Sequence, residues 1–113
     1  MATQIPLNTF RLFTGNLQSG SNTVYQEQTK DISSIILSAV IANITNQNQN
    51  ISVKIASGSV TSSLLLNATV PPSESLNPFI GRIVLEKGNA LILSTNTTNA
   101  LDYTLSILEN ANN

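Results

Sequence analysis

The sequence predicts an all-β protein: a single-domain, two-sheet antiparallel β-sandwich, jelly-roll-like, with about eight strands and an extended N-terminal arm. Apolar and polar residues alternate in short runs, which is the period of a strand. Turn-forming residues separate these runs at intervals of roughly 8–15 residues, as in sandwiches and barrels. No segment shows a convincing helical pattern, and a length of 113 residues suits one domain.

The strand and domain limits follow from these runs. We expect an arm and first strand over residues 1–14, the sandwich over residues 15–109 and a flexible tail over residues 110–113. Pro71 and Pro72 end the fifth run, because proline has no amide hydrogen for a sheet ladder. The strands are expected, in chain order, over residues 9–14, 23–28, 34–44, 51–56, 60–70, 79–86, 90–95 and 101–109.

Two turns have recognisable chemistry. Residues 46–50 (NQNQN) follow the third strand. Asn tolerates positive φ and bonds to local backbone, so this segment is expected to close a hairpin. Gly88 lies between Lys87 and Asn89 and is expected to take a positive φ.

The third strand is apolar on both predicted faces. One face carries Ile35, Leu37, Ala39 and Ile41, and the other carries Ile36, Val40, Ala42 and Ile44. Such a strand is either central in its sheet and buried on both faces, or has one of its faces in an interface with another subunit. A buried helix is the alternative, but the β-branched content and the Asn-rich stop favour a strand.

The later strands alternate more clearly. In the sixth, Ile83 and Leu85 share one face, and Val84 lies on the other. The last strand is expected to point apolar residues inward and polar residues outward. The inward set is Leu101, Tyr103, Leu105 and Ile107, and the outward set is Asp102, Thr104 and Ser106.

The composition argues against an enzyme. The chain has no His and no Cys, so the commonest general base and the usual zinc ligands are missing. Charged residues make up 10% of the chain, against about 25% in typical proteins. We expect no catalytic residue, no cofactor and no metal. The net charge of −1 favours neither nucleic acid nor an anionic membrane as partner.

Apolar residues near the N-terminus and in two other segments are candidates for an interface. Phe10, Leu12 and Phe13 crowd both faces of the first strand. They indicate either an edge strand folded over the sandwich or an arm, residues 2–14, that packs on a neighbouring subunit. The candidate interface residues are Ile5, Leu7, Phe10, Leu12, Phe13, Ile36, Val40, Pro78 and Phe79.

The C-terminal third, NPFIGRIVLEKGNALILSTNTTNALDYTLSILE, resembles small β-sandwich virion proteins of tailed bacteriophages, including phages of marine cyanobacteria. The resemblance rests on the strand Gly81–Glu86, the Gly88-Asn89 turn and the last strand Ala100–Glu109. The opening MATQIPLNTFRLFTG and the segment Ser33–Leu37 are also similar. It implies a structural protein of the capsid surface, often trimeric, that binds the major capsid protein or other virion proteins.

Three functions follow as hypotheses. The first is a non-enzymatic capsid decoration (cement) protein located on the virion. The second is a neck, tail or baseplate accessory protein of the same particle. The third is a receptor- or carbohydrate-binding module, against which the scarcity of aromatic residues and the absence of Trp count.

Overall fold

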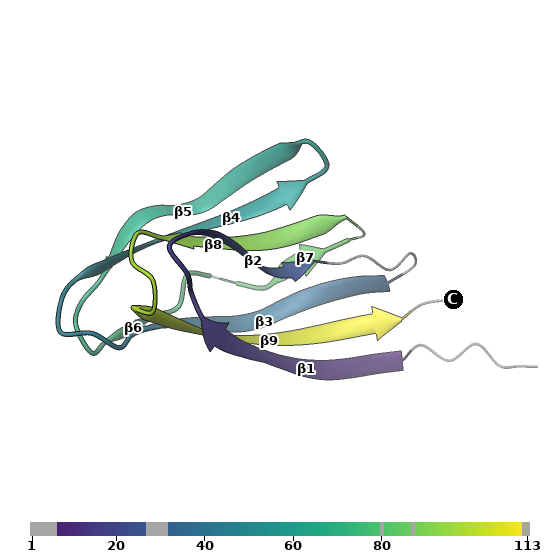
Figure 1. Ribbon diagram of the computed structural model, residues 1–113. Coiled ribbons are helices and arrows are strands. Elements are labelled where there is room, and N and C mark those ends of the chain that lie inside the picture. The colour runs from purple at the N-terminus through teal and green to yellow at the C-terminus, as the bar shows by residue number, and fades with distance from the viewer. Residues whose placement is uncertain (1–6, 27–31, 80, 87, 112–113) are drawn as a thin grey trace, which may run out of the picture.

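The computed structural model describes residues 7–26, 32–79, 81–86 and 88–111. The chain forms two stacked antiparallel sheets (Figure 1). Sheet A has the order β1-β9-β3-β6, and β7 also pairs with β3; sheet B has the order β2-β8-β4-β5. The strands are β1 (Leu7–Asn16), β2 (Gly20–Gln26), β3 (Ile32–Asn43), β4 (Gln49–Ser57), β5 (Val60–Val70), β6 (Ser75–Leu76), β7 (Ile83–Leu85), β8 (Asn89–Thr95) and β9 (Leu101–Ala111).

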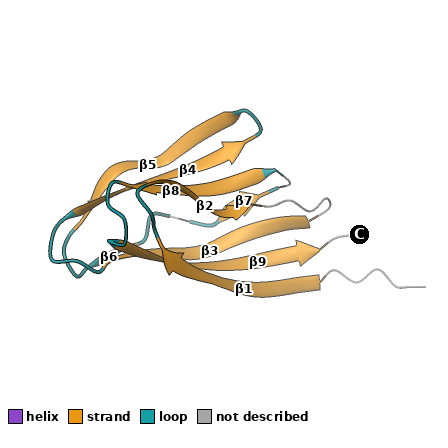
Figure 2. Ribbon diagram, viewed as in Figure 1, coloured by secondary structure: helices purple, strands orange, loops and turns teal. Residues whose placement is uncertain are grey.

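The strand order is that of a jelly roll, which confirms the predicted two-sheet antiparallel sandwich, with nine strands in the described residues instead of about eight. Of the expected N-terminal arm, residues 7–14 belong to β1 at the edge of sheet A, and residues 1–6 lie outside the described residues. The first strand pairs with the last, β2 pairs with β8, β3 pairs with β6 and β7, and β4 pairs with β5. The chain is therefore one long antiparallel hairpin wound over itself into two sheets. The described part of the chain is strand and loop throughout (Figure 2), and it contains no helix of a length and apolarity that would cross a membrane.

The two sheets enclose one apolar core. Alternate residues of the central strands point inward, which is the pattern of a sandwich covered on its inner faces. Full burial of one Leu or Ile side chain stabilises the fold by about 1.5–3 kcal/mol relative to leaving that side chain exposed. The largest buried side chains are Leu17, Ile36, Ile41, Ile51, Val53, Val70, Leu85, Leu91, Leu93, Leu101, Leu105 and Ile107.

The predicted faces of β3 are wrong because the strand contains a bulge. The β3–β9 register shifts between Ile36 and Ser38, so Leu37 is an extra residue. An extra residue reverses the inward and outward alternation of everything that follows it. As a result Ile36 and Ile41 both lie in the core, while Val40 is exposed.

The expected hairpin at residues 46–50 is also wrong. These residues do form a connection, but β3 lies in sheet A and β4 lies in sheet B, so the chain crosses between sheets here. Buried Asn43 organises the crossing: its Nδ2 donates to the carbonyl oxygens of Gln47 and Val70, and its Oδ1 accepts from the backbone N–H of Thr45. The expectation for Gly88 is confirmed by its φ of +86°.

Of the predicted sixth strand, residues 79–86, only Ile83–Leu85 is strand, as β7. The other short strand, β6, lies in the segment that was expected to be a loop, and residues 77–79 and 81–82 are not strand. Pro78 cannot donate to a ladder, and the Asn77 side chain accepts a hydrogen bond from the Phe79 backbone N–H instead. At the other end of the chain, β9 continues through Asn110 and Ala111, which pair with β1; residues 112–113 lie outside the described residues.

Candidate interaction surface

A row of apolar residues crosses the outer face of sheet A. Phe10 of β1 lies opposite Leu108 of β9, which lies opposite Ile35 of β3, which lies opposite Val84 of β7. We call these four residues the apolar row. Phe10 is 74% exposed and Val84 is 58% exposed, so the row ends in two uncovered hydrophobic side chains. Contiguous apolar surface of this kind marks interaction sites in soluble proteins.

A groove runs beside the apolar row. The next cross-strand set is Leu12, Ser106 and Ser38, with the bulged Leu37 beside it. Leu12 is 64% exposed. The groove has a volume of about 330 Å³ and is lined by Phe10, Arg11, Leu12, Leu37, Ser106 and Ile107. The small side chain of Ser106 thus lies between larger apolar neighbours, and it leaves room for a side chain from a partner.

The other end of this face is polar. Thr14 of β1 lies opposite Thr104 of β9, and Thr104 lies opposite Val40 of β3. In the following row Asn16 Nδ2 donates to Asp102 Oδ1 at 2.7 Å. The outer face of sheet A therefore changes along the strands from apolar, through hydroxyl-bearing, to amide and acid.

The outer face of sheet B differs. Its central row is hydroxylic, because Ser21 lies opposite Ser94, and Ser94 lies opposite Ser52. The Ser21 and Ser94 hydroxyls are hydrogen-bonded at 3.0 Å. The central strands of sheet B thus carry hydroxyls where those of sheet A carry the apolar row, and the most exposed apolar side chains of sheet B lie on its edge strand β5.

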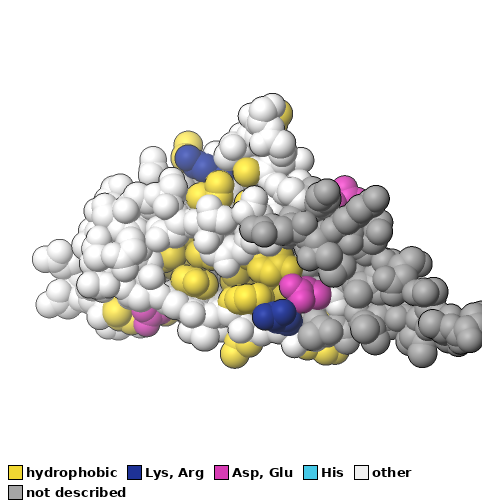
Figure 3. Space-filling model, turned by 45° about the vertical axis from the view of Figure 1, so that its right-hand side comes forward, with side chains coloured by type: hydrophobic (Ala, Val, Ile, Leu, Met, Phe, Trp, Pro, Cys, Tyr) yellow, Lys and Arg dark blue, Asp and Glu magenta, His cyan; other side chains and the backbone are white. Residues whose placement is uncertain are grey.

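Charge is sparse around the apolar row. Arg11 Nη1 lies 3.4 Å from Glu109 Oε1, and the Arg11 guanidinium lies 5.3 Å from the centre of the Phe13 ring. Arg11 and Glu109 alternate with Phe10 and Leu108, so their side chains point to the opposite side of sheet A, although Arg11 also lines part of the groove. Figure 3 shows a largely white surface with a central band of hydrophobic side chains, an adjacent dark blue and magenta pair at the lower edge of that band, and a few scattered charged groups elsewhere.

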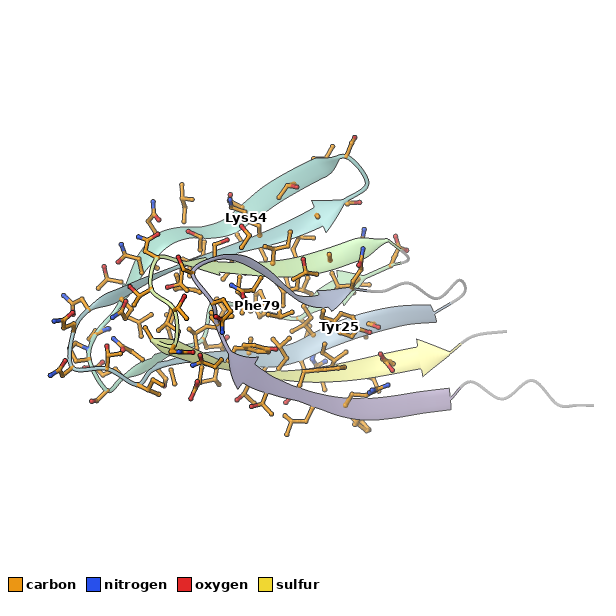
Figure 4. The ribbon with its side chains drawn as sticks, in the orientation of Figure 1. Tyr25, Lys54 and Phe79 are labelled. Atoms are coloured by element: carbon orange, nitrogen blue, oxygen red, sulfur yellow. The ribbon has the colours of Figure 1, made fainter. Side chains whose placement is uncertain are left out.

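A hydrogen-bonded cluster holds β1 and β9 against sheet B. The buried Tyr25 hydroxyl donates to Glu109 Oε2 at 2.7 Å and lies 2.7 Å from the Ser34 hydroxyl. Its ring packs edge-on against Phe13, with 5.3 Å between ring centres. Tyr25 lies between the two sheets in Figure 4. These contacts fix β1 in place and so preorganise the apolar row on its other side.

A second apolar area lies at the edge strand β5. Leu66 and Val60 are exposed, and a groove of about 190 Å³ is lined by Leu64, Pro78, Phe79, Gly81 and Ile83. The β4–β5 register shifts on both sides of the Val53–Leu65 pair, and Asn67 has a φ of 50°. Bulges of this kind twist an edge strand and hinder its pairing with other chains.

The structure separates the candidate interface residues. Phe10, Leu12 and Val40 lie on the outer face of sheet A, as an interface requires. Ile36 has no exposed surface, because the β3 bulge turns it into the core, so it is unavailable to a partner. Phe13 packs against the core, and Pro78 and Phe79 line the β5 groove. Leu7 begins β1, and Ile5 lies outside the described residues.

Sequence reasoning missed Ile35, Leu37, Leu108 and Val84 as parts of this surface. In the sequence Val84 alternates with the charged Arg82 and Glu86, which is a signal for an outward position. The sequence does not show that β7 and β1 flank the same sheet. Within the described residues, no three His, Cys, Asp or Glu side chains come together as metal ligands would.

Comparison with known proteins adds a fold relationship. No family model and no curated protein matches the sequence. Among solved structures, a subunit described under "Bacillus endospore appendages form a novel family of disulfide-linked pili" is similar with a TM-score of 0.57 and 11% identity, covering 98% of this chain and 91% of that one. At this identity the match shows a shared fold.

A second solved structure is a pentameric capsid protein from metagenomic phage sequences. It has a TM-score of 0.42 and 11% identity, and the match covers 88% of this chain and 60% of that one. This similarity is too low to add to the fold assignment.

Proposed function

We propose that this protein is a non-enzymatic structural subunit of a repeating assembly, and specifically a capsid decoration protein of a tailed phage. The observation that supports it is the outer face of sheet A, where Phe10 and Val84 at the ends of the apolar row, and Leu12, are exposed beside a groove. A protein that works alone gains nothing from this surface. A subunit of an assembly gains about 25 cal/mol for each Å² of it that becomes covered.

The uncharged polar surface suits the same role. Ser, Thr and Asn side chains lose less on desolvation than charged ones do, so they tolerate wet, hydrogen-bonded contacts with protein. A decoration protein is present in many copies, so that weak contacts per copy still give firm attachment through multivalency. The low charge of the chain, 10% of residues, therefore supports a role in assembly.

The resemblance to virion proteins falls on the strands that form this surface. Its two strongest segments contain β7 and β9, which contribute Val84 and Leu108 to the apolar row. The appendage protein that shares the fold is a subunit of a disulfide-linked pilus. This chain has no cysteine, so the contacts proposed for it are non-covalent.

Purified particles of the source phage test the proposal. Mass spectrometry should detect the chain in them, and image reconstruction should place it on the capsid exterior in hundreds of copies, an order-of-magnitude expectation from the symmetry of shells. About six or twelve copies would instead indicate a neck or tail ring. Absence of the chain from particles would contradict a virion role altogether.

A further inference from the structure

We propose that the outer face of sheet A is covered by the same face of a second copy, related by a two-fold axis that runs parallel to the strands between β9 and β3. This inference rests on the proposed function as a structural subunit and names the partner of its adhesive surface. Each copy then places β9 over β3 of the other. Leu37 of each copy fills the groove over Ser106 of the other.

The axis follows from the arrangement of the rows. A two-fold parallel to the strands exchanges β9 with β3 and β1 with β7, and it keeps each row over its own row. Phe10 then faces Val84 of the second copy, and Leu108 faces Ile35. The alternative is a two-fold axis that runs perpendicular to the strands, in the plane of the sheet. With the two faces fully overlapped, that axis would place the apolar row over the polar row of Asn16 and Asp102. Of these two axes, only the parallel one covers the apolar row with the apolar row of the second copy.

The charges permit this contact between identical faces. Among the described outward positions of β1, β9, β3 and β7, the charged side chain is Asp102, and the proposed axis places it over Ala42 of the second copy. Like charges are thus kept apart. Arg82 and Glu86 flank β7 with opposite signs, are exposed, and form no ion pair within the described part of the chain. Among the described residues this rim thus carries one charge of each sign, and such a pair does not repel its copy.

The size of the face suits a stable pair. Strands lie about 4.8 Å apart and rise about 3.4 Å per residue, so a face three to four strands wide and ten residues long measures roughly 14–19 by 34 Å. Two such faces together bury on the order of 1,000–1,300 Å², at or above the roughly 1,000 Å² expected of a specific interface. Sheets that pack face to face with aligned strands lie about 10 Å apart, which is the spacing that interdigitating Leu and Phe side chains fill.

The pair has a consequence for the shell. It leaves the hydroxyl-rich outer faces of sheet B on its two outer sides, uncovered by the second copy. A two-fold pair is also a different smallest unit from the trimer that the virion-protein resemblance implies. Solution mass separates the two.

Sedimentation equilibrium of the full chain over a range of concentrations tests the pairing, with the variant Ser106→Arg and its matched control Ser94→Arg. Both serines are half-buried, lie in central strands and point outward, one from each sheet. We expect the wild type and Ser94→Arg to form a reversible dimer. Ser106→Arg should weaken the dimer at least about tenfold, because the groove then holds a charge, while its circular-dichroism spectrum stays that of a β protein. A monomer at all concentrations, a trimer, or equal effects of the two variants would overturn the proposal.

Cysteine cross-linking tests the axis, since the chain has no cysteine of its own. A mixture of Leu37→Cys and Ser106→Cys chains should form the mixed disulfide under mild oxidation. If Phe10→Cys chains cross-link to one another faster than Leu37→Cys chains cross-link to Ser106→Cys chains, β1 lies over β1 of the second copy. That result would overturn the parallel axis. These results are independent of the proposed function: absence from particles contradicts the virion role, whereas a monomer in solution contradicts the pair.

Discussion

The Tyr25 hydroxyl of sheet B donates a 2.7 Å hydrogen bond to Oε2 of Glu109 in sheet A. The same hydroxyl lies 2.7 Å from the Ser34 hydroxyl of β3, and because Tyr25 already donates to Glu109, Ser34 is the donor in that pair. One phenol thus connects β2, β3 and β9. The contact lies directly behind the apolar row and ties the position of β1 and β9 to the opposite sheet.

Replacing Tyr25 by Phe should destabilise the fold by about 1–3 kcal/mol. The substitution keeps the ring against Phe13 but removes a bond to a carboxylate and leaves the buried Ser34 hydroxyl without this partner. Urea unfolding measures the change. Tyr103→Phe is the matched control and should change stability by less than about 0.5 kcal/mol. Equal losses in both variants would contradict a role for the Tyr25 hydroxyl.

Replacing Gly15 by Ala should cost about 1–2 kcal/mol, because it overpacks a cross-strand contact. Gly15 lies opposite Tyr103, and a Cβ at Gly15 would lie 2.9 Å from Cε1 and from the hydroxyl oxygen of that ring. Thermal unfolding measures the loss. Gly81→Ala is the control, since a Cβ there meets no atom within 4 Å. Most of the loss caused by Gly15→Ala should disappear when Tyr103 is also replaced by Leu, with the double variant compared with Tyr103→Leu alone. If the loss remains, the Tyr103 ring is not its cause.

Replacing Asn43 by Ala should destabilise the protein by about 2–3 kcal/mol. The Asn43 side chain donates to two carbonyl oxygens and accepts from Thr45, and these groups lose their partner when it is removed. Asn46→Ala, in the exposed part of the same crossing, should stay within about 0.5 kcal/mol of the wild type. Denaturant unfolding of the two variants side by side checks the difference. A larger loss in the Asn46 variant would show that the exposed amides hold this segment.

Self-association should be insensitive to salt. The proposed contact joins apolar and hydroxyl-bearing side chains, so screening has little to act on. Raising NaCl from about 0.01 to about 1 M shortens the Debye length from roughly 30 to roughly 3 Å. We expect the dimer dissociation constant, measured by sedimentation, to change by less than about threefold or to fall. A tenfold rise would show that charges such as Arg82 and Glu86 hold the copies together.

The sequence was sufficient for the parts of the fold that alternate without interruption. β5 begins and ends where predicted, and in β9 Leu105 and Ile107 point inward while Thr104 and Ser106 do not. Period-2 alternation decides such positions locally, without knowledge of the partner strand. The jelly-roll connectivity was expected as a class, but the strand order depends on long-range pairing that no local pattern encodes.

The candidate surface was only partly predictable for the same reason. Phe10 and Leu12 stand out in the sequence, yet their neighbours on the surface come from β9, β3 and β7. The bulge at Leu37 leaves no clear local signal, because Ile35, Ile36 and Leu37 are all apolar, and it reverses the faces beyond it. Pro78 was correctly expected to lie outside the strands, but the short β6 before it was not predicted, and the strand after it was predicted to begin at residue 79 instead of Ile83.

Side-chain oxidation by hydroxyl radicals, compared between dilute and concentrated protein, tests most directly the claim that the outer face of sheet A is where this protein adheres. Phe10 and Leu12 should lose most of their labelling as concentration rises, because the second copy covers them. Leu66 and Val60 of β5 are similarly exposed in one copy and should stay labelled. Unchanged labelling of Phe10 and Leu12, or protection confined to β5, would contradict the account.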